Sequence, residues 1–198
     1  MGSIQNICVY CGSSDKINAE YLQAAGDMGA ALVERGLRLV YGGGGTGMMG
    51  ALADAVLENG GEVIGIIPTM FETPELLHTG LTELIVVDDI NTRKTHMAEM
   101  SDAFVALPGG FGTFDELFEI LTWSQIGLHR NPIGILNTLE YFSPLLAIIE
   151  HARQEGFIYN EHIELLITES EPQALLTRME AFELPQNLER WVHRPEEH

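Results

Sequence analysis

The chain has 198 residues, of which 45% are hydrophobic and 20% are charged, a composition that suits a globular protein with one buried core. It carries 29 acidic residues against 10 lysines and arginines, and the resulting net charge of −19 argues against a nucleic-acid polymer as partner. Residues 1–6 lack a secretion signal and no apolar run could cross a membrane, so we expect a cytoplasmic protein without a membrane partner.

Six short apolar segments are predicted as strands, namely residues 6–10, 38–41, 63–67, 83–87, 103–107 and 133–137. Segments with a helical period are predicted as helices, namely residues 19–35, 47–58, 92–101, 113–125, 143–155 and 172–180. The strands are too apolar to have a face in water. This alternation predicts an α/β fold, a Rossmann-like doubly wound and mostly parallel sheet with helices on both faces. Ligands of such sheets bind beyond the C-terminal ends of the strands.

The domain organisation is predicted to be simple. We assign residues 1–183 to a single Rossmann-like domain and residues 184–198 to a C-terminal tail with no assigned role. Residues 68–82 contain two prolines and polar punctuation directly after a strand, so they are predicted as a loop or lid.

Cys8 and Cys11 form a Cys-x-x-Cys pair, which a redox motif or half of a zinc site also shows. A redox pair lies at a helix N-terminus, whereas these residues flank an apolar strand, and the chain has no second ligand pair for zinc. The context favours two reduced thiols packed at a strand end, and we expect no metal site.

A first glycine-rich loop, residues 42–47, follows the second predicted strand and opens a helix. Glycines there let the backbone turn tightly and approach an anion, which makes Gly43 and Gly44 candidate binding residues. The pattern formally matches the dinucleotide fingerprint, but it does not follow the first strand and no acidic residue ends the next strand. The loop therefore favours a shorter phosphate ligand over a dinucleotide, and a purely structural turn remains the alternative.

A second glycine-rich loop follows the fifth predicted strand and precedes an amphipathic helix. Its candidate binding residues are Gly109, Gly110, Phe111, Gly112 and Thr113. Thr113 is predicted to cap the helix, whose unpaired N–H groups and dipole favour a bound anion. No lysine follows the glycines, so the loop is not a Walker A motif.

Three charged residues near these loops are candidates for chemistry. Glu116 is predicted in the first turn of the helix after the second loop, where it either takes part in catalysis or simply complements the helix dipole. Arg93 and Lys94 are adjacent cations in an acidic chain. An anionic ligand at this sheet edge would use them as counter-charges, while a solvated pair is the alternative.

Several motifs occur together in the chain: Tyr41-Gly42-Gly43-Gly44, Arg93-Lys94, Pro108-Gly109-Gly110-x-Gly112-Thr113-x-x-Glu116 and Cys11-Gly12-Ser13-Ser14. In this combination they resemble the LONELY GUY family, the cytokinin riboside 5′-monophosphate phosphoribohydrolases. The resemblance extends from about residue 7 to residue 156. It departs from the family at Phe111, where relatives often have tyrosine, and at Ile90-Asn91, where they often have Met-His.

The resemblance implies a homodimeric enzyme that hydrolyses the N-glycosidic bond of an N6-modified AMP and releases the free base and ribose 5-phosphate. It implies neither a metal nor another cofactor. Arg93 and Glu116 match the family's catalytic pair, and the second glycine loop matches its phosphate cradle. Glu75 matches a base-binding carboxylate, and Ser13 and Lys94 join the candidate substrate-binding residues.

Three other functions compete with this one. A general AMP nucleosidase would use the same residues, and a non-enzymatic carrier of a nucleotide or a molybdopterin-type cofactor would use the same loops without chemistry. Members of the family have also been labelled lysine decarboxylases. A pyridoxal enzyme needs a lysine for its Schiff base, and neither Lys16 nor Lys94 lies in a recognisable setting for one.

Two further interpretations concern apolar residues. An N6 substituent needs an apolar pocket, for which Met48, Met97 and Phe71 are candidates, with core packing as the alternative. Trp123 and residues 126–128 are candidates for a dimer surface, and core packing is again the alternative.

Overall fold

Seven strands form one sheet in the computed structural model, which describes residues 3–188. They are β1 (Asn6–Tyr10), β2 (Arg38–Tyr41), β3 (Val63–Pro68), β4 (Glu83–Val87), β5 (Ala103–Ala106), β6 (Ile133–Leu136) and β7 (Leu166–Glu169). The order is β4-β3-β2-β1-β5-β6-β7 and every neighbouring pair is parallel. The direction of winding reverses between β1 and β5, which places a crevice at their C-terminal ends.

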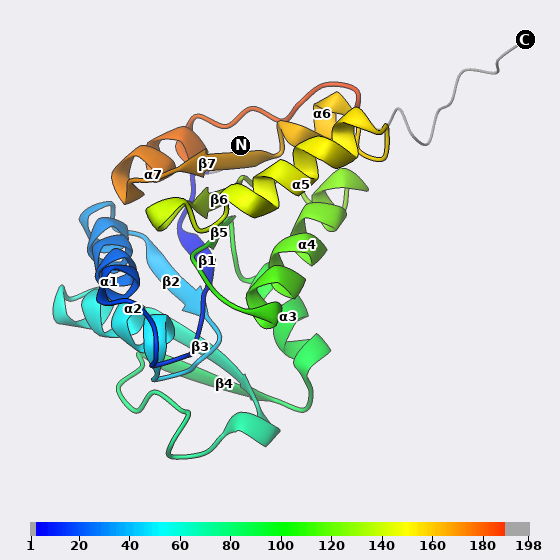
Figure 1. Cartoon of the computed structure of the whole chain (residues 1–198). Helices are drawn as coiled ribbons and strands as arrows, with labels where there is room; N and C mark the ends of the chain where they lie inside the picture. The colour runs from blue at the N-terminus through cyan, green and yellow to red at the C-terminus, as the bar shows by residue number, and fades with distance from the viewer. Residues whose placement is uncertain (1–2, 189–198) are drawn as a thin grey trace, which may run out of the picture.

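Helices cover both faces of the sheet (Figure 1). They are α1 (Ala19–Glu34), α2 (Gly47–Glu58), α3 (Ile90–Glu99), α4 (Phe111–Gln125), α5 (Ser143–Gln154), α6 (Asn160–Ile163) and α7 (Pro172–Glu180). One core contains residues of α1, α2 and α7, and the other contains residues of α3 and α4 with α5 packed against it. Strand β1 supplies both cores alternately, because Ile7 and Val9 point to the first while Cys8 and Tyr10 point to the second.

The predicted doubly wound α/β fold is confirmed, and the sheet is parallel throughout. Strand β7 and helix α6 were not predicted. Strand β7 is an edge strand in which only Ile167 is buried, and the apolar run that enters it, Leu165–Ile167, is only three residues long. Helix α6 is only four residues long, which is too short for a helical period to appear. Two helices also begin earlier than predicted, α3 at Ile90 and α4 at Phe111.

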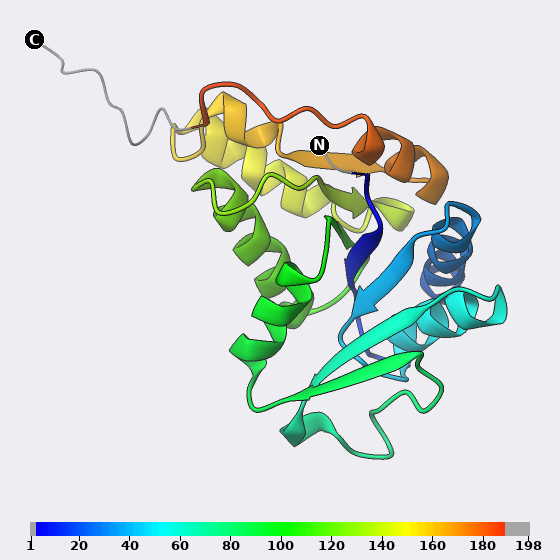
Figure 2. The same cartoon turned by 180° about the vertical axis from the view of Figure 1, so that it is seen from behind.

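The segment between β3 and β4 is irregular, as predicted, apart from one short 3-10 turn at Thr69–Phe71. It extends past the β4 edge of the sheet in both views of the chain (Figure 1, Figure 2). Two backbone hydrogen bonds attach it to the first glycine loop: the Gly45 N–H donates to the Leu76 carbonyl at 2.7 Å, and the His78 N–H donates to the Gly43 carbonyl at 3.0 Å. The segment is therefore held next to the crevice.

The two cysteines are free and buried, as predicted. Burial raises the pKa of both thiols well above the ordinary value, which keeps Cys8 and Cys11 protonated. Within residues 3–188, no helix is long and apolar enough to cross a membrane. The boundary between residues 1–183 and the tail at 184–198 stays a prediction, because residues 189–198 lie outside the described part of the chain.

Candidate active site

A cavity of about 610 Å³ opens at the C-terminal ends of the central strands. Its walls come from the loops after β1, β2, β3 and β5 and from the N-terminal parts of α2, α3 and α4. The loops after β1 and β5 touch, because the Gly12 N–H donates to the Pro108 carbonyl at 3.0 Å. The cavity thus occupies the point where the winding of the sheet reverses, the usual ligand position in this class of sheet.

Arg93 and Glu116 form an ion pair in the wall of the cavity. The Arg93 Nη1 donates to Glu116 Oε1 at 2.9 Å, and its Nε donates to the Ile66 carbonyl at 3.0 Å. Their side chains are only 13% and 9% exposed. Asp89 caps α3 by accepting from the N–H groups of Asn91 and Thr92, which fixes the helix start and so the position of Arg93. Residues 23 positions apart in sequence are thus joined in one buried pair.

Gly42 was quoted in a motif but was not among the candidate binding residues, and its position bears on Arg93. A Cβ atom at this position would lie 1.6 Å from Arg93 Nη2, so the guanidinium occupies the space that any side chain would fill. The absence of a side chain at Gly42 therefore sets the position of Arg93 over β2 and β3. Its place as the first of four consecutive glycines was the only signal in the sequence.

The N-terminus of α4 points free hydrogen-bond donors at the cavity. Gly110 is the N-cap and makes no side-chain cap, and within the described residues no acceptor bonds the N–H groups of Phe111, Gly112 and Thr113. All three residues line the cavity. Together with the helix dipole, these donors make a site for an anion close to Glu116.

Two predictions about this helix were wrong, because the helix begins two residues earlier than predicted. Thr113 is not the cap, because the chain becomes helical directly after the extended Gly110 and Thr113 is buried in the first turn. Glu116 consequently lies beyond the first turn, which contains no acidic residue. A carboxylate one turn deeper does not compete with a ligand for the terminal N–H groups.

The helix N-terminus at the first glycine loop is already occupied by the protein itself. The Gly47 N–H donates to Asp15 Oδ1 at 2.9 Å, and the N–H groups of Met48 and Met49 donate to the Gly12 carbonyl at 3.0 and 3.3 Å. These bonds satisfy the donors that would otherwise bind a phosphate. The structure therefore favours the second loop, not the first, as the anion site.

Burial and the neighbouring Arg93 both affect the charge of Glu116. Burial raises the pKa of the Glu116 carboxyl above its ordinary value, and the Arg93 guanidinium opposes that rise. Loss of the cation would therefore favour the protonated acid. In the arrangement observed, a carboxylate and a set of N–H donors face one cavity, which suits stabilisation of positive charge beside a bound anion.

The remaining candidate residues divide by position. Ser13, Gly44, Gly110, Phe111 and Gly112 line the cavity. Gly43, which has a φ of +76°, and Gly109, which packs against the Thr113 side chain, do not line this cavity.

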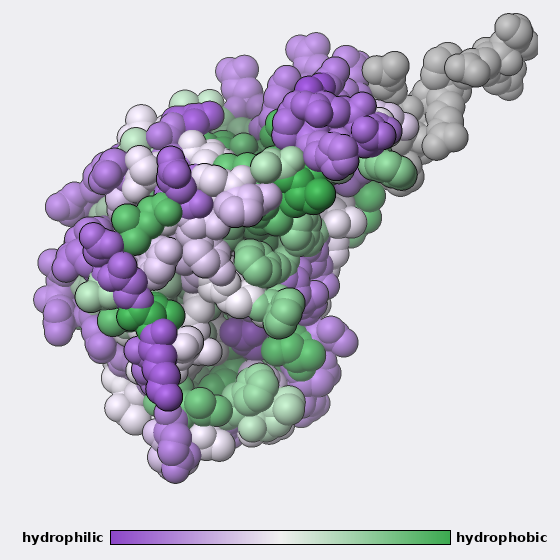
Figure 3. Space-filling model, in the orientation of Figure 1, coloured by the Kyte–Doolittle hydropathy of each residue, from purple (hydrophilic) through white to green (hydrophobic). Residues whose placement is uncertain are grey.

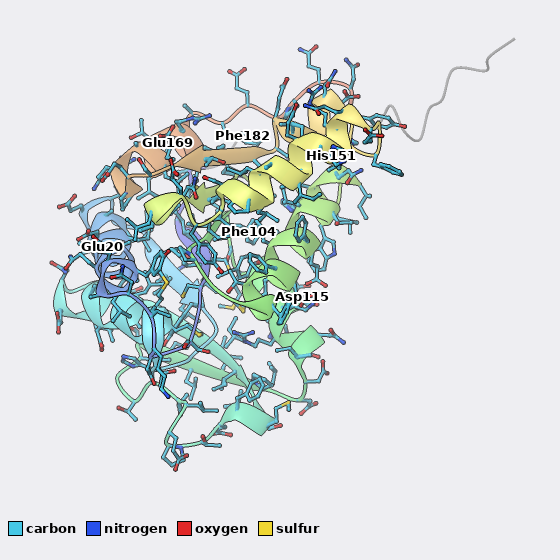
Figure 4. The ribbon with its side chains drawn as sticks, in the orientation of Figure 1. Glu20, Phe104, Asp115, His151, Glu169 and Phe182 are labelled. Carbon is cyan, nitrogen blue, oxygen red and sulfur yellow. The ribbon has the colours of Figure 1, made fainter. Side chains whose placement is uncertain are left out.

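Lys94 points away from the cavity and bonds Asp115 at 2.9 Å and Glu119 at 3.1 Å. Asp115 projects from the start of α4 beside α3 (Figure 4). Burial works against the ammonium charge, but the two carboxylates raise the pKa of Lys94 overall. Glu75 is exposed on the segment after β3 and is not among the residues that line the cavity.

Apolar side chains form another part of the cavity wall. Met49, Phe71, Leu76 and Ile90 contribute to its lining. Of the three residues considered for an apolar pocket, only Phe71 lies there, since Met48 and Met97 are each 1% exposed in the two cores. The cavity therefore combines an anion-binding end, a charged pair and an apolar wall.

Comparison with known proteins identifies the family of the chain. A family model described as "Possible lysine decarboxylase" matches residues 49–179. The cytokinin riboside 5′-monophosphate phosphoribohydrolase of Rhodococcoides fascians is 53% identical over 155 residues, which are 78% of this chain and 78% of that protein. The chain belongs to the LONELY GUY family of phosphoribohydrolases. An Arabidopsis thaliana member is 43% identical over 178 residues, 90% of this chain and 83% of its own length.

Solved structures of other proteins have the same fold as this LONELY GUY family member. The molybdenum cofactor binding protein of Rippkaea orientalis superposes with a TM-score of 0.69 at 20% identity, covering 89% of this chain and 96% of that chain. The molybdenum cofactor carrier protein of Chlamydomonas reinhardtii has a TM-score of 0.68 at 21% identity, covering 90% of this chain and 99% of that chain. At such identities the likeness concerns the fold alone.

The decarboxylase description of the family model does not fit the site. Pyridoxal chemistry requires a lysine within reach of the cofactor. The chain has only Lys16 and Lys94. Lys16 is exposed in the loop after β1, Lys94 is paired with two carboxylates of α4, and neither lines the cavity.

Proposed function

We propose that the protein hydrolyses the N-glycosidic bond of an N6-modified AMP, a cytokinin riboside 5′-monophosphate, releasing the free base and ribose 5-phosphate. The observation that carries the proposal is the buried Arg93–Glu116 pair beside the uncapped N-terminus of α4. The names of the relatives, at 53% and 43% identity, agree with it.

The 5′-phosphate would bind the N–H groups of Phe111, Gly112 and Thr113 at the start of α4. Binding energy from this end of the substrate then orients the ribose over the Glu116 carboxylate. Nucleosides without the phosphate should consequently be poor substrates.

Cleavage of the glycosidic bond moves its electron pair to the base and leaves an oxocarbenium-like ribose. The negative charge of Glu116 stabilises that positive charge. A water oxygen then bonds to the sugar carbon, and one proton of this water is transferred to the departing base.

Arg93 acts on this step through Glu116. Its bonds to Ile66 and Glu116 hold the carboxylate in place, and its charge opposes the rise in pKa that burial causes. Arg93 therefore opposes protonation of the Glu116 carboxylate in a setting that favours it.

The apolar wall of the cavity supplies selectivity for the base. Phe71, Leu76 and Ile90 are 39–42% exposed, which leaves apolar surface uncovered at the mouth. An apolar group on N6 would cover this surface, whereas the bare amine of AMP would not. The preference for N6-modified AMP over AMP follows from that difference.

The test is chromatographic detection of free base after incubation with isopentenyladenosine 5′-monophosphate, AMP and isopentenyladenosine in parallel. We expect fastest release from the modified monophosphate and very slow release from the nucleoside. Equal kcat/KM for AMP and the modified monophosphate would indicate a general AMP nucleosidase. Tight nucleotide binding with no release from any compound would indicate a carrier.

We also propose a homodimer, formed through α4 and α5. Apolar side chains gather on this side of the molecule (Figure 3), and Phe118, Ile126, Leu128 and Ile148 are 42–66% exposed. Helix α5 has no fully buried residue although its sequence is amphipathic. Light scattering should give twice the chain mass for the native protein and the monomer mass for Leu128→Asp. A native monomer would refute this part of the proposal.

A further inference from the structure

We infer that Tyr141 is a positioning residue for the phosphate loop, an inference that rests on the proposed function. Its hydroxyl group donates a hydrogen bond to the carbonyl oxygen of Gly109. Tyr141 does not line the catalytic cavity, whereas the next residue of the loop, Gly110, does. Tyr141 instead lines a neighbouring cavity of about 250 Å³ together with Gly109 and Gly110, so it contacts the loop from outside the catalytic cavity.

The hydrogen bond fixes the orientation of one peptide unit. The Gly109 carbonyl and the Gly110 N–H belong to the same planar trans peptide, so they point in opposite directions. When Tyr141 binds the carbonyl, the Gly110 N–H is directed to the other side of the loop. Within residues 3–188 this N–H has no acceptor, and Gly110 is exposed at the cavity. Tyr141 thus adds a fourth donor to the three at the start of α4.

The loop needs such a restraint from outside. Gly109, Gly110 and Gly112 have no side chains of their own to hold them, and glycine loses more conformational freedom than any other residue when it is ordered. Thr113 packs against Gly109, but among the described residues its hydroxyl makes no hydrogen bond to the loop's backbone. Among the described residues, Tyr141 is the side chain that bonds the loop's backbone.

The tyrosine ring is itself held in place. It stacks on the ring of Phe114 in α4, with 6.5 Å between the ring centroids. It also packs edge to face against Tyr21 and Phe142, with centroid distances of 5.8 and 5.1 Å. Because Phe114 belongs to the helix whose N-terminus forms the anion site, the ring contacts both the loop and the helix.

The backbone before Tyr141 is strained. Leu139 and Glu140 have φ values of +51° and +58°, which non-glycine residues adopt rarely. Such conformations persist where the surroundings impose them, and they gather at functional sites. Here Asn137 Oδ1 accepts from the Phe142 N–H at 2.7 Å and closes the turn around the two strained residues. The turn therefore presents Tyr141 to the loop.

The test compares Tyr141→Phe with Tyr21→Phe. Each removes one hydroxyl from the same aromatic cluster, and the Tyr21 hydroxyl makes no hydrogen bond among the described residues. Calorimetry with ribose 5-phosphate measures phosphate binding without turnover. We expect Tyr141→Phe to weaken this binding about five- to tenfold and to lower kcat/KM for the monophosphate by a similar factor. Residual turnover of the nucleoside should not change, and Tyr21→Phe should match the native protein.

Equal losses for monophosphate and nucleoside would overturn the inference, because a merely structural role would reduce both. Unchanged ribose 5-phosphate affinity in Tyr141→Phe would overturn it as well, and so would a native protein that does not bind ribose 5-phosphate. If ribose 5-phosphate affinity depends on the Tyr141 hydroxyl but no base is released from any nucleotide, the proposed hydrolysis fails while the positioning role stands.

Discussion

Arg93→Met removes the cation that contacts Glu116 and keeps an apolar side chain of similar reach. The change breaks two hydrogen bonds, to Glu116 at 2.9 Å and to the Ile66 carbonyl at 3.0 Å, in a place where both charged side chains are nearly buried. Removing one partner of a buried ion pair costs about 3–5 kcal/mol, because the other charge is left without compensation. We expect a loss of unfolding free energy in that range near neutral pH.

The loss should depend on pH in a defined direction. The pKa of Glu116 is raised in the folded protein, so its contribution to stability is complete below the pKa of the unfolded chain and is lost as pH rises through the folded pKa. Without Arg93 the folded pKa rises further, and each additional unit adds about 1.4 kcal/mol of instability above it. The variant should therefore lose less stability at pH 5 than at pH 8.

Urea unfolding at the two pH values measures this difference, and the pH dependence of kcat/KM provides a second measure. The acid limb of the rate profile should move to higher pH in Arg93→Met, because Glu116 must be ionised to act. An equal loss of stability at both pH values, together with an unmoved acid limb, would refute the electrostatic role assigned to Arg93.

Three other changes test separate parts of the structure. Gly42→Ala should displace the Arg93 guanidinium, since the new Cβ would lie 1.6 Å from Nη2, and lower kcat/KM about a hundredfold in steady-state assays. Glu140→Gly should relieve the φ of +58° and raise the urea-unfolding free energy by about 1 kcal/mol. Phe71→Ala should reduce the kcat/KM preference for the N6-modified monophosphate over AMP about tenfold, and an unchanged ratio would remove Phe71 from the base pocket.

Local pattern was enough to predict much of the fold and part of the site. The central strands are buried on both sides, so their apolar runs are unmistakable, whereas the apolar run that enters the edge strand β7 is only three residues long. Glu116 stood out as a charge next to a glycine loop, and Arg93 stood out as one of two adjacent cations in an acidic chain. Their contact with each other could not be read from spacing, because it depends on where α3 and α4 meet.

Other features depend on contacts between distant segments. Asp15, from the loop after β1, occupies the helix N-terminus at the first glycine loop, and this decides which loop remains open to an anion. The space beside Gly42 is filled by a residue 51 positions away, and Tyr141 reaches a carbonyl 32 positions before it. Glycine loops look alike in sequence, and only the packing around them shows which one has free donors. The cytoplasmic location stays a prediction.

The most direct test of the site is single-turnover release of base from isopentenyladenosine 5′-monophosphate by the native protein and by Glu116→Gln. The substitution keeps the shape of the side chain and removes its negative charge, while the phosphate-binding end of the cavity is unchanged. We predict that the variant binds ribose 5-phosphate normally and releases base about a thousandfold more slowly. A correctly folded Glu116→Gln variant that releases base at the native rate would contradict the assignment of Glu116 as the catalytic carboxylate.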